Sequence, residues 1–167
     1  QVSCPLQFLC LEVSPTTAMS VKVYGMPASA NAMAPTLFAM HAGVGGLEMC
    51  NLMEGAHMTP EFLAMNPFHH IPTMKDGELA IGEGSAILRY IALKYKQTDA
   101  YPEEDLAKTA MIDFALTTAQ TEVYGTGFAT VVYPVMGFAP SYPEDQPAAN
   151  KAFNEAIDTW LNHFVKN

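Results

Sequence analysis

Positive charge is scarce in this sequence of 167 residues, which has 8 lysines and arginines against 17 acidic residues. The formal net charge of −9 argues against binding to nucleic acid or to an anionic membrane surface, because both need clustered basic side chains. Charged residues of both signs make up only 15% of the chain, below the roughly 25% of an average soluble domain. We therefore expect some of the surface to be covered.

Cysteine and long apolar runs are also scarce. The three cysteines, Cys4, Cys10 and Cys50, form no CxxC pair, which excludes a disulfide framework and a zinc site of the usual spacing. No uncharged apolar run approaches the roughly 18 residues of a spanning helix, and neither a secretory signal nor an arginine-rich transit peptide fits the start. We expect a cytoplasmic protein, or an organellar one if residues 1–18 are a processed N-terminus.

Composition and pattern divide the chain into three segments. Residues 1–18 carry a single charge and are interpreted as an N-terminal extension outside the main fold. Residues 19–96 show strand and helix signals in the order βαβαββα, which predicts an α/β domain. Residues 102–167 show helical signals only and hold nine acidic and three basic residues, a net charge of −6.

Short local signals place the expected elements. Strands are predicted at 21–24, 47–53, 71–75 and 78–81, the last two joined as a hairpin through Asp76-Gly77. Helices are predicted at 29–41, from Thr59-Pro60 onward and at 84–95. In the C-terminal segment, a helix begins near Pro102. It is expected to break or end at Gly125, Gly127, Pro134, Gly137 or Pro140, and another helix carries Phe153, Trp160 and Phe164 on one face.

Two segments carry a resemblance to a known family. Residues 55–73, GAHMTPEFLAMNPFHHIPT, resemble the central segment of the glutathione S-transferases, most closely the serine-type theta, phi and delta classes. Residues 83–90, EGSAILRY, resemble the family's Glu-Ser-x-Ala-Ile-x-x-Tyr segment. The similarity runs from Val21 to about Tyr95, and over 102–167 it is only architectural. It implies a thioredoxin-like domain followed by a helical domain, with glutathione as co-substrate.

The resemblance assigns one catalytic residue. Ser29 lies at the entrance to the first helix, where a hydroxyl can donate to a bound sulfur or act as a plain N-cap. The family aligns it with the catalytic serine, which activates the glutathione thiol for attack on an electrophilic small molecule.

The resemblance also implies a set of glutathione-binding residues, which are His57, His69, Ile71, Pro72, Glu83, Gly84 and Ser85. A cis bond at Ile71-Pro72 would hold the cysteinyl backbone of glutathione, whereas an ordinary trans proline starting a strand is the alternative. Glu83 fits the γ-glutamyl group. Gly84 departs from the family because a serine usually stands there, which removes a side-chain donor worth roughly 1.5–3 kcal/mol.

Three histidines, His57, His69 and His70, lie within the first resembling segment. The resemblance assigns His57 and His69 to the glycyl carboxylate of glutathione, and it leaves His70 without a role. On an extended segment, adjacent His69 and His70 should point to opposite faces. No metal site is expected, because no third ligand has suitable spacing.

Three functions are compatible with the sequence. The first is a glutathione S-transferase that works as a homodimer or as a subunit of a larger complex. The second is a non-catalytic accessory subunit of a larger, organellar assembly, favoured by Gly84, by the apolar segment 1–18 and by a helical domain that we interpret as truncated. The third, a thioredoxin-like redox protein, is disfavoured because no cysteine lies near Ser29.

Overall fold

The computed structural model describes residues 20–138 and 143–165 and forms two compact units, residues 1–88 and 89–167. The expected N-terminal extension, residues 1–18, lies outside the described residues. The boundary between the units falls inside one helix, α3 (Gly84–Lys94). In the described ranges, no helix is both long enough and apolar enough to cross a membrane.

A four-stranded mixed sheet forms the centre of the first unit. Its strands are β1 (Val21–Gly25), β2 (Gly45–Met49), β3 (Thr73–Asp76) and β4 (Leu79–Gly82). They lie in the order β2-β1-β3-β4, with β2 parallel to β1 and with β3 and β4 antiparallel to their neighbours. The predicted thioredoxin-like order of elements is therefore confirmed.

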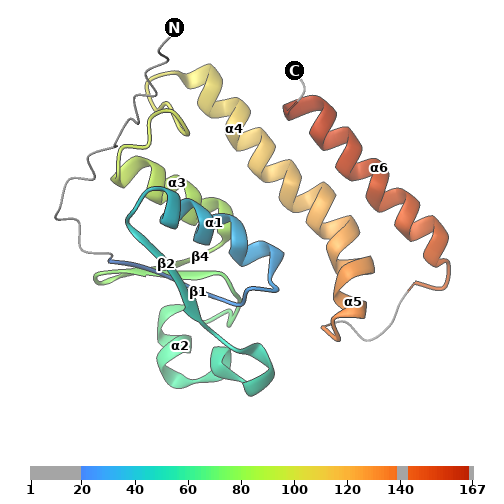
Figure 1. Cartoon of the computed structure of the whole chain (residues 1–167), viewed down its shortest axis with the longest axis horizontal. Helices are drawn as coiled ribbons and strands as arrows, with labels where there is room; N and C mark the ends of the chain where they lie inside the picture. Colours follow the sequence, from blue (N-terminus) through green and yellow to red (C-terminus); the bar gives the residue numbers. More distant parts are fainter. Residues whose placement is uncertain (1–19, 139–142, 166–167) are drawn as a thin grey trace, which may run out of the picture. The chain divides into compact units, whose positions relative to one another are not determined.

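Helical segments connect and follow these strands. They are α1 (Ala30–His41), the 3₁₀ turns η1 (Leu52–Glu54) and η2 (Ala56–Met58), α2 (Pro60–Met65) and α3 (Gly84–Lys94). Helix α1 and the first turns of α3 lie side by side on one side of the sheet (Figure 1). Val23, Met74 and Ile87 are fully buried, so the core lies between the central strands and these helices.

Local signals predicted most of these elements to within a few residues. The hairpin turn lies one residue later in the chain than predicted. Asp76 is paired with Leu79 in the ladder, so the two-residue loop is Gly77-Glu78 and not Asp76-Gly77. Gly77 has φ +61°, a left-handed conformation that glycine adopts without a steric cost. Strand β2 begins at Gly45, two residues before its predicted start, and ends at Met49, four residues before its predicted end. The 3₁₀ turn η1 follows it.

The second unit is helical. It contains α4 (Leu106–Thr118), the π-helix η3 (Ala119–Val132), α5 (Tyr133–Val135) and α6 (Gln146–Phe164). Gly125 and Gly127 do not end the helix, because the chain stays helical through both glycines. The end comes later among the expected positions, after Pro134 in α5 and before Gly137, which has φ +78°. A Cβ on Gly127 would lie 1.8 Å from Cδ2 of Phe153, so this glycine allows the Phe153 ring of α6 to lie directly on the backbone of η3.

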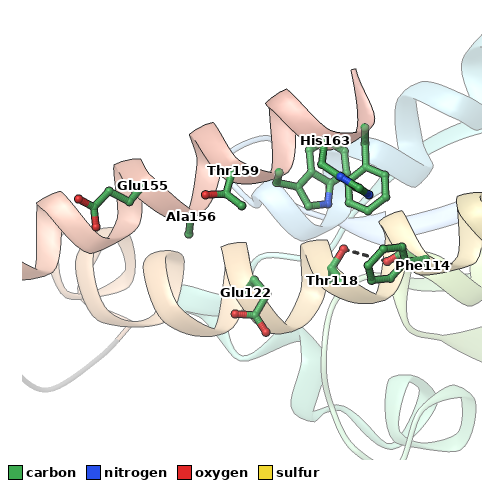
Figure 2. A pocket seen from close by; sticks show the side chains of 9 residues that line it. Phe114, Thr118, Glu122, Glu155, Ala156, Thr159 and His163 are labelled. Carbon is green, nitrogen blue, oxygen red and sulfur yellow. Dashed lines mark hydrogen bonds between the residues drawn. The ribbon is translucent and has the colours of Figure 1, made fainter. Parts of the chain in front are cut away.

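Helix α6 also packs against α4. A groove of about 410 Å³ runs between α4 with the start of η3 on one side and α6 on the other (Figure 2). Nε1 of Trp160 donates a hydrogen bond to the carbonyl oxygen of Ala115 at 3.0 Å, which fixes the indole against α4. The Phe164 ring lies 5.1 Å from Phe114 and 5.3 Å from Trp160 between centroids. These contacts hold the two helices together.

Candidate functional site

Ser29 forms the N-cap of α1. Its Oγ accepts a hydrogen bond from the backbone N–H of Ala32 at 3.3 Å, while its own N–H donates to the carbonyl oxygen of Met26 at 2.9 Å. The cap therefore uses a lone pair of Oγ and leaves the hydroxyl proton for another acceptor. Because Ser29 lies at the positive end of the helix dipole, an anion bound beside it is favoured.

The second component of the site is the segment before β3. The Ile71–Pro72 peptide bond is cis, Pro72 is buried and Ile71 is half-buried. Asn66, which is only 6% exposed, supports this segment. Its Nδ2 donates to the carbonyl oxygen of His70 at 3.1 Å and to Oγ1 of Thr73 at 2.8 Å.

Sequence reasoning gave Asn66 no role. Its Oδ1 accepts a hydrogen bond from the backbone N–H of Phe68 at 3.0 Å, the Asx-turn geometry that an Asn-Pro pair favours. The Asn-Pro signal could have predicted this turn. It could not have predicted that the amide would also reach Thr73, because that contact depends on the folded loop.

The amino-terminal end of α3 supplies the third component. Glu83 is exposed and has φ +65°, and its carbonyl oxygen accepts the backbone N–H of Ile87 at 3.0 Å. Gly84 and Ser85, both half-buried, form the first turn of the helix. Their backbone N–H groups lie where a helix has no internal acceptors, so this turn can bind a carboxylate.

These three components meet at Gly84. A Cβ placed on Gly84 would lie 3.4 Å from the carbonyl oxygen of Asn31 in α1 and 3.9 Å from Cγ of Pro72. The fold therefore brings the starts of α1 and α3 together beside the residue that follows Ile71. Two helix amino termini at one place create a positive local potential without any basic side chain.

The histidines form a second group on the same unit. The rings of His57 and His69 lie 6.1 Å apart between centroids, and Nδ1 of His57 is buried without a hydrogen-bond partner among the described residues. The expectation that His69 and His70 point to opposite faces is wrong, because their rings meet edge-on at 5.3 Å. His69 has φ +49°, so the segment is not extended and the alternation fails.

Among the residues that the structure describes, neither a metal-binding cluster nor an exposed thiol is found. Within residues 20–138 and 143–165, no group of three or more histidine, cysteine or acidic side chains is arranged to hold a metal ion. Cys50, at the end of β2, is buried, and burial raises the pKa of its thiol. A protonated, enclosed thiol is a poor redox nucleophile.

The sequence of this chain also matches known proteins. The family model described as "Glutathione S-transferase, N-terminal domain" matches residues 19–93. Glutathione S-transferase 3 of Zea mays is 31% identical over 154 residues, which cover 88% of this chain and 68% of that protein.

Solved structures give the same result. A glutathione transferase of Bombyx mori aligns with a TM-score of 0.74 and 32% identity over 87% of this chain and 66% of its own. Human glutathione transferase theta-2, solved with glutathione, aligns with a TM-score of 0.70 and 28% identity over 84% of this chain and 59% of its own. The matched region of this chain thus spans about two thirds, or less, of the length of these relatives. On the matched domain and this level of identity, the chain belongs to the glutathione S-transferase family.

Proposed function

We propose that this protein binds glutathione on its first unit and activates the glutathione thiol for attack on an electrophile. The observation that carries the proposal is the meeting of the Ser29 end of α1, Pro72 and the Gly84 end of α3. This arrangement offers a hydroxyl donor and a carboxylate-binding turn in one place. The relatives from Zea mays and Bombyx mori are transferases by name, which favours catalysis over the accessory-subunit alternative.

The tripeptide backbone is assigned to residues 71–85, the stretch from the cis-proline to the first turn of α3. The backbone N–H and C=O of Ile71 pair with the cysteinyl residue as one strand pairs with another, and Pro72 positions them. The carboxylate of Glu83 binds the γ-glutamyl ammonium group. The backbone N–H groups of Gly84 and Ser85, with the Ser85 hydroxyl, bind the γ-glutamyl carboxylate.

The glycyl end of glutathione is assigned to His57 and His69. A terminal carboxylate between these rings would accept hydrogen bonds from imidazole N–H groups. The unpartnered Nδ1 of His57 supports this assignment, because a buried polar atom without a partner destabilises the fold until a ligand satisfies it.

The chemical step follows from Ser29. A free thiol has a pKa of about 8.5, so little thiolate exists at neutral pH. A hydrogen bond from Oγ of Ser29 to the sulfur, with the dipole of α1, stabilises the thiolate and lowers that pKa. The sulfur then forms a bond to the electrophilic carbon, the leaving group departs with its electron pair, and the thiol proton passes to solvent.

Replacement of Ser29 tests this step. In Ser29→Ala we expect the ultraviolet absorption of the bound thiolate to fall at neutral pH. Turnover of a generic aromatic electrophile should fall about tenfold or more, since one pKa unit is a factor of ten. Glutathione binding, measured by calorimetry, should change much less.

A second variant separates catalysis from stability. Ser29 also caps α1, and an alanine at an N-cap costs about 0.5–2 kcal/mol, whereas glycine costs only a few tenths. Ser29→Gly should therefore lose the thiolate signal while keeping most of the stability. Turnover that is unchanged in both variants would contradict the role of Ser29, and a wild-type protein that does not bind glutathione would contradict the whole proposal.

We also propose that two copies associate and that the protein acts in the cytoplasm, where glutathione is kept reduced. Phe68, in the loop between α2 and β3, is 72% exposed although its backbone is held by the Asx turn of Asn66. Met53 and Met58 are also exposed, by 74% and 52%. Exposed apolar groups on one segment are typical of a surface that a partner covers.

A further inference from the structure

Met26 lies in the turn between β1 and α1, and its side chain reaches the segment that follows β2. A hydrogen bond from the backbone N–H of Cys50 to the carbonyl oxygen of Gly25, at 2.8 Å, extends the pairing of β1 with β2. Beyond this bond, β1 leads to Ser29 and β2 leads to η1. The Sδ atom of Met26 joins the two segments, because it accepts a hydrogen bond from the backbone N–H of Leu52 at 3.4 Å.

The N–H group of Leu52 has no acceptor within its own turn. Leu52 is the first residue of η1, and the first N–H groups of a helix lack intrahelical partners. The next two are satisfied locally, since Met53 donates to Oδ1 of Asn51 at 3.1 Å and Glu54 donates to the carbonyl oxygen of Asn51 at 3.2 Å. Because Leu52 is half-buried, loss of the sulfur would leave a poorly solvated donor.

Backbone hydrogen bonds connect this anchor to His57. The carbonyl oxygen of Leu52 accepts the N–H of Gly55 at 3.1 Å. The carbonyl oxygen of Gly55 in turn accepts the N–H of Met58 at 2.9 Å, which closes the turn η2 that contains His57. A displacement of η1 is therefore passed on to the His57 ring.

The main chain of Met26 holds the other side of the site. Its carbonyl oxygen accepts the backbone N–H of Ser29 at 2.9 Å, a bond that does not depend on the side chain. One residue thus contacts the start of α1 through its carbonyl group and η1 through its sulfur.

We propose that Met26 is a positioning residue of the glutathione site, which fixes His57 through Leu52 and thereby sets the affinity for the glycyl end of glutathione. The inference rests on the proposed function, because it takes His57 as the partner of the glycyl carboxylate. A thioether suits this position, since it packs like an apolar side chain and still offers a weak acceptor.

Met26→Leu tests the acceptor, because leucine has a similar volume and accepts no hydrogen bond. We expect glutathione affinity, measured by calorimetry, to fall about fivefold, and KM for glutathione to rise by the same factor. The thiolate absorption and kcat at saturating glutathione should stay within about twofold of the wild type, because the bond to Ser29 is kept. Met26→Gln should restore the affinity, since its amide oxygen can accept the Leu52 N–H.

Three further measurements separate this role from general stability. Met40→Leu makes the same change at a residue that is 59% exposed on α1, and it should leave the affinity within about twofold. Met26→Leu/His57→Ala should bind glutathione as His57→Ala does, because a residue that acts through His57 has no effect once the ring is removed. Without glutathione, the Leu52 amide should exchange its hydrogen faster in Met26→Leu than in the wild type or Met26→Gln.

The outcomes distinguish this inference from the proposed function. If the wild type binds glutathione and Met26→Leu binds it equally well, Met26 has no positioning role, although the proposed function stands. The same conclusion follows if the losses in Met26→Leu and His57→Ala are additive. It also follows if Met26→Gln loses as much affinity as Met26→Leu, or if circular dichroism shows both variants to be unfolded. A wild type that does not bind glutathione would contradict the proposed function, and the role of Met26 with it.

Discussion

Gly84 is the residue at which this chain departs most clearly from the family pattern. The position has room for a side chain, because an added Cβ would meet only ordinary contacts at 3.4 Å and 3.9 Å. Its neighbours are the carbonyl oxygen of Asn31 and Cγ of Pro72. Crowding therefore does not exclude a serine at this position. In the proposed glutathione site, the carboxylate would be bound by backbone N–H groups and by Ser85.

Gly84→Ser should restore a side-chain donor to this turn. A hydrogen bond to a charged group contributes about 1.5–3 kcal/mol, so glutathione affinity should rise about tenfold or more. Calorimetric titration of the variant with glutathione measures this directly. Gly84→Ala is the matched control, because it adds the same Cβ without a hydroxyl and should leave the affinity near that of the wild type. Equal gains in both variants would contradict the assigned role of this turn.

Residue-scale predictions succeeded where the signal was local. Ser29 and Thr59 were recognised as helix starts, and each accepts the expected hydrogen bond from a backbone N–H three residues later. The direction of the His69 side chain was not predicted correctly, because the left-handed φ of His69 depends on the loop that Asn66 holds. A side chain whose direction is decided by such a loop cannot be predicted from spacing alone.

At the scale of elements, η3 shows how tertiary packing overrides a local rule. Two glycines in one helix predict an end, since glycine favours the unfolded chain. Here α6 packs along η3, and Phe153 contacts Phe128 edge-on at 5.4 Å while covering Gly127. The glycine that weakens the isolated helix therefore allows the close contact between two helices.

Gly127→Ala should destabilise the helical unit. Its Cβ would lie 1.8 Å from the Phe153 ring, and such overpacking costs about 1–3 kcal/mol. Denaturant unfolding followed by circular dichroism measures the loss. The double variant Gly127→Ala/Phe153→Leu should recover some of it, because a smaller side chain leaves room for the added methyl group.

Gly125→Ala is the matched control for this clash. The same methyl group there would lie 3.5 Å from the nearest atom, the carbonyl oxygen of Gln120. Without a clash, alanine in a helix interior is more stable than glycine by about 0.5–1 kcal/mol. If both variants are equally destabilised, the packing of Phe153 on Gly127 is not the cause.

At the scale of the whole molecule, the low charge fraction found in the sequence corresponds to apolar side chains that reach solvent in both units. Phe68 and Met53 are examples in the first unit, and Leu106 is 78% exposed in the second. Composition could indicate that some surface is covered, but not which surface, because exposure is decided by folding. Phe68 is the best candidate for association, since the Asx turn holds its loop in place and little ordering is needed on binding.

Phe68→Ser should therefore weaken association between copies. Burial of a phenylalanine side chain contributes about 1.5–3 kcal/mol, so the dissociation constant of the dimer should rise about tenfold or more, as measured by sedimentation velocity across a concentration series. Met40→Ser is the control, because Met40 is 59% exposed on α1 and lies outside the proposed surface. A wild type that is monomeric throughout, or a Met40→Ser variant that dissociates as readily, would show that Phe68 does not hold two copies together.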